Sequence, residues 1–320
     1  MKSKSFRGWS MLIVSNFIFA GAYVSGKIAL ASVSPIVLNT LRFIVASTLL
    51  VPILIAQRKY LRMNRRDLLI FITVSLCSFV LNKFFEYWGL SLSNASDTAL
   101  LISGEGVFTA ILAWVILKEQ ITFGRVAALL IGLFGAYLII ERGLVPHFQE
   151  SGSTSLRIIG DGLFLLSLVF EAFSSIISKK LTGKFSPLFI TSATVTGSLF
   201  VWIPAGSVDI ALHGLKLTWP AAAGILYLGV LVTATAYYLW FGGLQIISAA
   251  SAAVTLFLQP LIGALLAVFI LGDQIGLFTL IGGICIIVSM WMISWPVPNK
   301  KELEIGLNVA VSDLDTFRGV

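Results

Sequence analysis

Seven charged side chains interrupt the long apolar stretches of this chain, and their types could support chemistry. A charge at the centre of a membrane-spanning helix costs roughly 2.5–3.5 kcal/mol, so each needs a polar partner, a cavity or a ligand. Three are basic and four are acidic, and all but the last lie in the first half of the chain: Lys27, Arg42, Lys83, Glu86, Asp97, Glu105 and Glu171.

Glu105 is the strongest candidate for a functional carboxylate. It lies near the middle of an apolar stretch between Gly104 and Gly106. Two glycines allow a helix to open and let its backbone approach a ligand. The carboxyl group could hold a proton or a substrate amine. The alternative is a structural ion pair with Lys83 or Arg42.

Glu171 is the second candidate, at the middle of another apolar stretch. Ser174, Ser175 and Ser178 follow it at spacings of three, four and seven, which puts all four side chains on one helical face. Such a polar stripe can line a cavity. Serines also form close-packing faces in membrane helices, but that alternative does not explain the carboxylate.

A polar group of three residues lies in the stretch before Glu105. Asn82 and Glu86 are four residues apart, and Lys83 is three residues before Glu86. Lys83 and Glu86 either neutralise each other or contribute separately to a site. Arg42 could hold a carboxylate by a bidentate pair, and that carboxylate belongs either to Glu86 or to a substrate.

Other polar and aromatic residues complete the candidate site. Asn16, Tyr23 and Lys27 share one helical face at spacings of seven and four, although Lys27 is near enough to a helix end to reach the interface. Tyr237 belongs to an aromatic group with Tyr238, Trp240 and Phe241. Such aromatics are either interface anchors or the wall of an apolar substrate site. The site also includes Gln259.

These residues must be positioned by membrane-spanning helices. The chain has 320 residues, of which 58% are hydrophobic and only 12% are charged, whereas soluble domains carry roughly 25% charged residues. Stretches of about 20 apolar residues span a bilayer. Ten are present: 9–29, 36–56, 68–89, 96–117, 122–141, 160–178, 187–205, 219–241, 248–271 and 276–295. The first also resembles a signal peptide, but its removal would destroy a repeat described below.

Other classes of site lack the residues they need. Cys77 and Cys285 are far apart in apolar runs, which excludes a disulfide framework or a zinc cluster. The histidines His147 and His213 fall in predicted loops without metal-ligand spacing. We therefore expect no metal, no cofactor and no catalytic residue. No glycine-rich phosphate loop is present, so transport would have to use a gradient or an exchange.

The basic residues orient the helices, because cytoplasmic loops carry an excess of Lys and Arg. With the N-terminus inside, sixteen of the 22 basic residues fall on the cytoplasmic side and three on the other, namely Arg142, Arg157 and Lys216. We therefore expect a multi-pass protein of the cell membrane with both termini in the cytoplasm. The net charge of +7 is a topology signal and does not indicate binding to nucleic acid.

The first five stretches repeat in the last five. Lys27 and Ser34-Pro35 match Lys179 and Ser186-Pro187 at an offset of 152, and Leu117–Ile121 matches Leu271–Ile275 at an offset of 154. Because five is odd, the second copy must enter the membrane inverted, as in many secondary transporters. The sequence therefore predicts an all-α integral membrane protein. Its ten transmembrane helices form two inverted five-helix repeats, 8–141 and 159–295, before a polar cytoplasmic tail at 296–320.

The counterparts of the embedded charges in the second repeat are largely neutral. Four charged positions of the first repeat are matched by uncharged side chains: Thr194 for Arg42, Tyr237 for Lys83, Trp240 for Glu86 and Gln259 for Glu105. An asymmetric site between symmetric scaffolds is what a chemically specific pocket needs.

These features resemble the drug/metabolite transporter superfamily, specifically its ten-helix EamA-type members. The resemblance rests on the aromatic first stretch ending in Lys27, on Ser34-Pro35 and Arg42, and on the ends Leu117-Lys118-Glu119 and Leu271-Gly272-Asp273. It covers about residues 8–295. It implies an exporter or exchanger of small metabolites, with a central cavity lined by the first four helices of each repeat. Such proteins commonly have proline in the fourth helix, where this chain has Gly104-Glu105-Gly106.

The favoured function is a secondary transporter of a small metabolite, such as an amino acid, an amine or a drug-like compound. It would work by alternating access, with the small-molecule substrate, the lipid bilayer and protons as its expected partners. It would act as a monomer or a homodimer. A membrane-embedded enzyme would need a nucleophile with a base or a metal cluster, and no histidine lies in the stretches. A channel would need a ring of equivalent groups, which the asymmetric charges do not provide.

Overall fold

The computed structural model describes residues 2–61, 63–93, 101–119, 122–141, 154–263 and 277–294. Within these ranges all regular structure is helical. Asp97, His147, the 271–275 half of the repeat match and the predicted tail at 296–320 lie outside the described residues.

The described residues form a series of helices. In chain order they are α1 (Lys2–Ala20), α2 (Ala22–Leu30), α3 (Pro35–Ala56), η1 (Arg58–Leu61), α4 (Arg65–Val74), η2 (Ser75–Leu81), α5 (Asn82–Leu92), α7 (Gly104–Leu117), α8 (Phe123–Glu141), α9 (Thr154–Thr182), α10 (Pro187–His213), α11 (Trp219–Leu226), η3 (Tyr227–Ala236), α12 (Tyr237–Ile246), α13 (Ala249–Thr255) and α15 (Leu277–Ser294).

Six helical runs are long and apolar enough to cross a membrane: Lys4–Leu30, Pro35–Ala56, Arg65–Leu92, Ile158–Thr182, Pro187–His213 and Trp219–Ile246. Four shorter apolar helices lie at Gly104–Leu117, Phe123–Ile139, Ala249–Gly263 and Leu280–Met292. Each of these overlaps one of the predicted stretches. The predicted end at residue 205 is wrong for α10, because the helix continues to His213 and stops where Gly214 takes a positive φ of 74°.

The helices α3 and α10 pack against each other in opposite directions. Each begins at a serine that caps it and precedes a proline, a residue well suited to the first helical turn. The Ser34 hydroxyl donates to Asp209 near the end of α10, at 2.5 Å. The Ser186 hydroxyl donates to Gln57 just after α3, at 2.9 Å. Because the start of each helix contacts the end of the other, the two are antiparallel.

Two long helical runs contain a π-helical segment at their middle. The segment η2 separates α4 from α5, and η3 separates α11 from α12. In η3 the Thr233 hydroxyl bonds the carbonyl of Leu228, and the Thr235 hydroxyl bonds that of Val230, each five residues earlier. Such segments are common at functional sites, because the wider turn displaces the residues that follow it.

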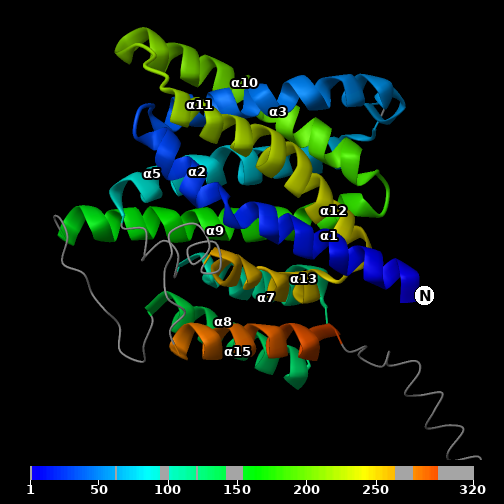
Figure 1. Cartoon of the computed structure of the whole chain (residues 1–320). Coiled ribbons are helices and arrows are strands. Elements are labelled where there is room, and N and C mark those ends of the chain that lie inside the picture. The colour runs from blue at the N-terminus through cyan, green and yellow to red at the C-terminus, as the bar shows by residue number, and fades with distance from the viewer. Residues whose placement is uncertain are drawn as a thin grey trace, which may run out of the picture.

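The helices pack in pairs that are stacked from α3 and α10 at the top of the view to α8 and α15 at the bottom (Figure 1). The pairs are α3 with α10, α5 with α9, α1 with α12, α7 with α13, and α8 with α15. The outer surface is apolar, and Phe123, Phe200 and Trp219 expose 89%, 87% and 84% of their side chains. A surface of large exposed apolar groups is suited to contact with lipid. Polar side chains are instead buried between the pairs.

Candidate functional site

A central cavity of about 40 Å³ lies between helices from both halves of the chain. Nine of the ten predicted site residues line it: Tyr23, Arg42, Asn82, Lys83, Glu86, Glu105, Glu171, Tyr237 and Gln259. Asn16 does not line the cavity. Lys27 is exposed and lies outside it. The structure therefore brings most of the predicted residues to one cavity, although the face shared by Asn16, Tyr23 and Lys27 contributes only Tyr23.

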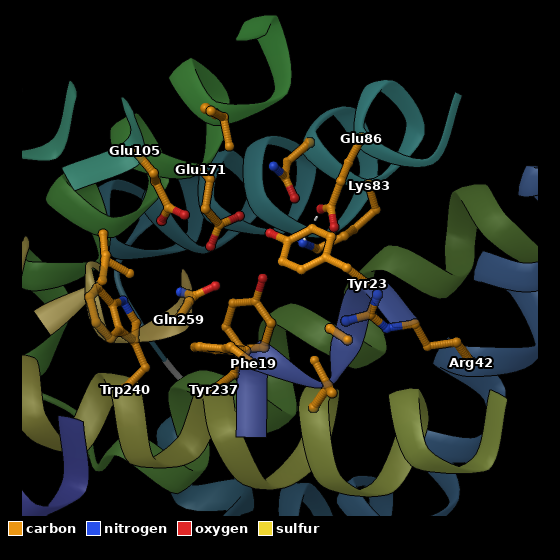
Figure 2. Close-up of a pocket in the computed structure, with 15 residues that line it drawn as sticks. Phe19, Tyr23, Arg42, Lys83, Glu86, Glu105, Glu171, Tyr237, Trp240 and Gln259 are labelled. Atoms are coloured by element: carbon orange, nitrogen blue, oxygen red, sulfur yellow. Dashed lines mark hydrogen bonds and ion pairs between the residues drawn. The ribbon is translucent and has the colours of Figure 1, made fainter. Parts of the chain in front are cut away.

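Two carboxylates face the cavity from opposite halves of the chain, Glu105 in the first turn of α7 and Glu171 in the interior of α9. Figure 2 shows the carboxyl groups of Glu105, from α7, and Glu171, from α9, as neighbours at one end of the site. The Ser78 hydroxyl donates to Glu171 Oε2 at 2.8 Å. Among the described residues Glu105 has no hydrogen bond or ion pair, although only 8% of its surface is exposed. The ion pairs with Lys83 or Arg42 that were the alternative for Glu105 do not form.

Lys83 and Glu86 form a buried ion pair within α5. The Lys83 ammonium lies 2.5 Å from Glu86 Oε2, which neutralises both groups inside the cavity wall (Figure 2). The backbone carbonyl of Lys83 also accepts a hydrogen bond from the Asn39 amide of α3, at 3.2 Å. The two charges are therefore paired with each other within one helix.

Arg42 is held without a carboxylate. Its Nε donates to Thr233 Oγ1 at 2.6 Å, and its Nη1 donates to the Tyr87 hydroxyl at 2.9 Å. Its Nη2 is buried without a partner. The expected pairing with Glu86 does not occur, and Arg42 keeps the NH₂ group of Nη2 available beside the cavity. This group could bind an anionic part of a ligand.

Asn16 acts behind the cavity wall. Its amide nitrogen donates to Thr255 Oγ1 at 2.9 Å, and its oxygen accepts from Gln259 Nε2 at 3.0 Å. Asn82 lines the cavity, and its amide donates to the carbonyl of Ser167 at 2.9 Å. The two bonds of Asn16 fix the amide of Gln259 and tie α1 to α13. Asn16 is therefore a positioning residue in this geometry.

Aromatic side chains close the apolar part of the cavity. Phe19 packs edge-to-face on Tyr237 with ring centroids 5.2 Å apart. Trp240 is buried and its Nε1 donates to Ser175 Oγ at 3.3 Å. Phe19 was absent from the predicted site, and Trp240 was weighed mainly as an interface anchor. Both could have been predicted from the repeat, because Trp240 occupies the position equivalent to Glu86 and Phe19 the position equivalent to Glu171.

Comparison with known proteins identifies relatives along nearly the whole chain. The profile of the EamA-like transporter family matches residues 6–141 and again residues 158–295. An uncharacterized transporter of Archaeoglobus fulgidus is 26% identical over 88% of this chain and 95% of that protein. The Bacillus subtilis protein named uncharacterized transporter YetK is 24% identical over 93% of this chain and 89% of its own. A solved crystal structure superposes with a TM-score of 0.71 at 15% identity, over 91% of this chain and 96% of that chain, so the fold is shared.

Proposed function

Because the chain belongs to the EamA-like transporter family, we propose that it is a secondary transporter that exports or exchanges a small metabolite. The chain is a multi-pass membrane transporter, as its apolar helices and its relatives indicate. The substrate is an amino acid, an amine or a drug-like compound, and its movement is coupled to protons. Family membership favours transport over enzyme chemistry.

We propose that residues 8–141 and 159–295 are two inverted five-helix repeats, with the termini in the cytoplasm of the cell. Three symmetric features support this. The cap contacts Ser34 to Asp209 and Ser186 to Gln57 are related by the offset of 152. The π-helical segments η2 and η3 begin at positions that differ by the same offset. The antiparallel packing of α3 and α10 fits an inversion.

The observation that carries the proposal is the cavity with one buried carboxylate from each half of the chain. Neither Glu105 nor Glu171 has a salt-bridge partner in the part of the chain that the structure describes. Two buried carboxylates without a basic partner bind a proton or an amine, because an uncompensated charge in a low dielectric is costly. Arg42, whose Nη2 has no partner, would receive an anionic group of the substrate.

The size of the cavity supports alternating access. At about 40 Å³ it is far smaller than the roughly 300 Å³ at which small-molecule sites begin. A metabolite therefore enters only if the helices around the cavity move apart. The glycines beside Glu105 and the π-helical segments are where α7 and the two long runs could bend.

The proposal is tested in liposomes that contain the purified protein. Overexpressing cells are first screened for resistance to toxic amino acids, amines and dyes, and the best compound is used as the transport probe. Uptake is then measured with and without an imposed pH gradient. We expect the gradient to stimulate wild-type transport and to have no effect on Glu105→Gln.

The control is Asp67→Asn, which removes a carboxylate that pairs with Lys184 at 2.8 Å, away from the cavity. This variant should keep the response to the gradient. Normal transport with a normal pH response in Glu105→Gln would refute the role of Glu105. Absence of transport for every compound in the wild-type protein would refute the function itself.

A further inference from the structure

We infer that Glu105 and Glu171 share a single exchangeable proton, and that Arg42 together with the Lys83–Glu86 pair sets this number at one. The inference deepens the proposed proton-coupled transport and rests on it. It concerns how many protons the site holds and what can replace them.

The argument begins with the charges that line the cavity. Two are basic and three are acidic, and each exposes 8% or less of its surface: Arg42, Lys83, Glu86, Glu105 and Glu171. If all were ionised, the lining would carry a net charge of −1. One bound proton makes it neutral. A neutral lining avoids the several kcal/mol that an uncompensated buried charge costs.

The hydrogen bonds indicate where that proton resides. The Lys83 ammonium lies 2.5 Å from Glu86, so the charge of this carboxylate is already paired. Glu171 accepts a hydrogen bond from the Ser78 hydroxyl, and the Tyr237 hydroxyl also interacts with it. Glu105 has no donor among the described residues, so its ionised form is the least stabilised. Because the two carboxyl groups are neighbours (Figure 2), the proton belongs to the pair and not to one residue.

The other titratable groups around the pair do not alter this sum. They are the phenols of Tyr23 on α2, Tyr87 on α5 and Tyr237 on α12, and the thiol of Cys77 in η2. Phenols and thiols that are free of metal are uncharged at neutral pH. Within the described part of the chain, the number of bound protons is therefore governed by the five charged residues.

Arg42 supplies the fixed positive charge. It is anchored by two neutral hydroxyls and has no carboxylate partner within the described ranges. Its charge offsets one of the two free carboxylates from the other end of the cavity (Figure 2). The second carboxylate must then take a proton or a ligand with one positive charge. A protonated amine that replaces the proton leaves the buried charge unchanged, so the exchange moves no net charge across the membrane.

The proton count can be measured without knowing the substrate. The infrared carbonyl stretch of protonated carboxyl groups is recorded for the purified protein at neutral pH, in H₂O and D₂O. The spectrum of the Glu105→Gln/Glu171→Gln double variant is subtracted to isolate the cavity. The wild-type protein should show a band that either single variant, Glu105→Gln or Glu171→Gln, abolishes.

Changing the basic residues should change the intensity of this band in steps that correspond to one protonated carboxyl group. Lys83→Met makes the net charge of the fully ionised lining −2, so the intensity of its band should be twice that of the wild type. Arg42→Gln should give the same twofold increase from a different helix. The matched control Lys83→Met/Glu86→Gln removes the ion pair and leaves the sum at −1, so its band should equal that of the wild type.

Two results would overturn the inference. One is a full band in Glu171→Gln, which would mean that burial alone keeps Glu105 protonated. The other is an unchanged band in both Lys83→Met and Arg42→Gln, each eluting as a folded protein. Neither result depends on transport, so failure of this inference is distinguishable from failure of the proposed function.

Discussion

The junction between α12 and α13 gives a prediction whose size can be worked from the structure. Lys118 ends α7 in the left-handed conformation, with a φ of 54°, and the next residue is Glu119. Its two carboxylate oxygens accept hydrogen bonds from the amides of Ala249 and Ala250, each at 3.1 Å. These are the first two amides of α13, which have no partner within their own helix. Glu119 thereby holds α13 to the end of α7.

We predict that Glu119→Gln lowers the free energy of unfolding by about 2 kcal/mol. A hydrogen bond to a charged group contributes roughly 1.5–3 kcal/mol, and the lower figure suits these two bonds because they are long and Glu119 is only half-buried. Glutamine keeps one oxygen acceptor but turns an NH₂ group toward the second amide. It also removes a negative charge from a helix N-terminus, which costs roughly 0.3–1 kcal/mol.

The assay is thermal unfolding of the purified protein. For a chain of this length, a loss of about 2 kcal/mol corresponds to a decrease in Tm of about 3 °C. The other side of the junction is held by Lys179, whose ammonium donates to the carbonyls of Leu244 and Ile247 at the end of α12. Lys179→Met should therefore also destabilise, and the double variant should lose at least about 0.5 kcal/mol less than the sum of the two.

The control is Lys180→Met, which removes the neighbouring, exposed lysine. It should unfold like the wild type. If Glu119→Gln has the same Tm as Lys180→Met, the two amide bonds contribute nothing to stability. If the effects of Glu119→Gln and Lys179→Met add fully, the two residues do not act on one junction.

Two further predictions concern packing. Gly135→Leu should lower the free energy of unfolding by at least about 1–3 kcal/mol, since a Cβ at this position would lie 2.6 Å from the backbone oxygen of Gly282 on α15. The control Gly162→Ala, in open space on α9, should leave the Tm equal or higher. Equal changes of Tm in the two variants would contradict the argument. Trp202→Phe should cost about 1–3 kcal/mol, because it leaves the carbonyl of Phe79 in η2 without its 2.7 Å donor, and an unchanged Tm in the same assay would show that this bond is dispensable.

Hydrophobic length alone was enough to predict the helical class and the membrane setting. Each apolar stretch overlaps a helix, because no other backbone arrangement satisfies its own hydrogen bonds in lipid. The helix ends were harder to predict. Residues 205–213 include polar and charged groups, yet α10 continues through them, because Asp209 is bound by Ser34 of another helix. The π-helical segments were not predicted, since the sequence of Ser75–Leu81 has no feature that separates a π-helix from an α-helix.

The positions of the candidate residues were predictable, and their pairing was not. The position of Glu105 between two glycines, the polar stripe of Glu171 and the embedded charge of Arg42 predicted a shared site, and all three residues line the cavity. Spacing cannot say whether Glu86 pairs with Lys83 on its own helix or with Arg42 on another. That choice depends on the distance between α3 and α5, and the hydroxyls of Thr233 and Tyr87 hold Arg42 in place of a carboxylate.

The duplicated sequence explains how equivalent positions of the two halves can line one cavity and yet carry different side chains. Equivalent positions of the two halves meet at its wall, with Lys83 and Tyr237, Glu86 and Trp240, and Glu105 and Gln259 all lining it. In the inverted duplication proposed above, a twofold axis in the membrane plane would place equivalent residues at equal distances from the midplane, on opposite sides of it. A substitution in one copy therefore changes the chemistry of one wall without moving the helix that carries it. Four of the five lining charges lie in the first half, while the second half supplies Glu171 and the aromatic and amide groups Tyr237, Trp240 and Gln259.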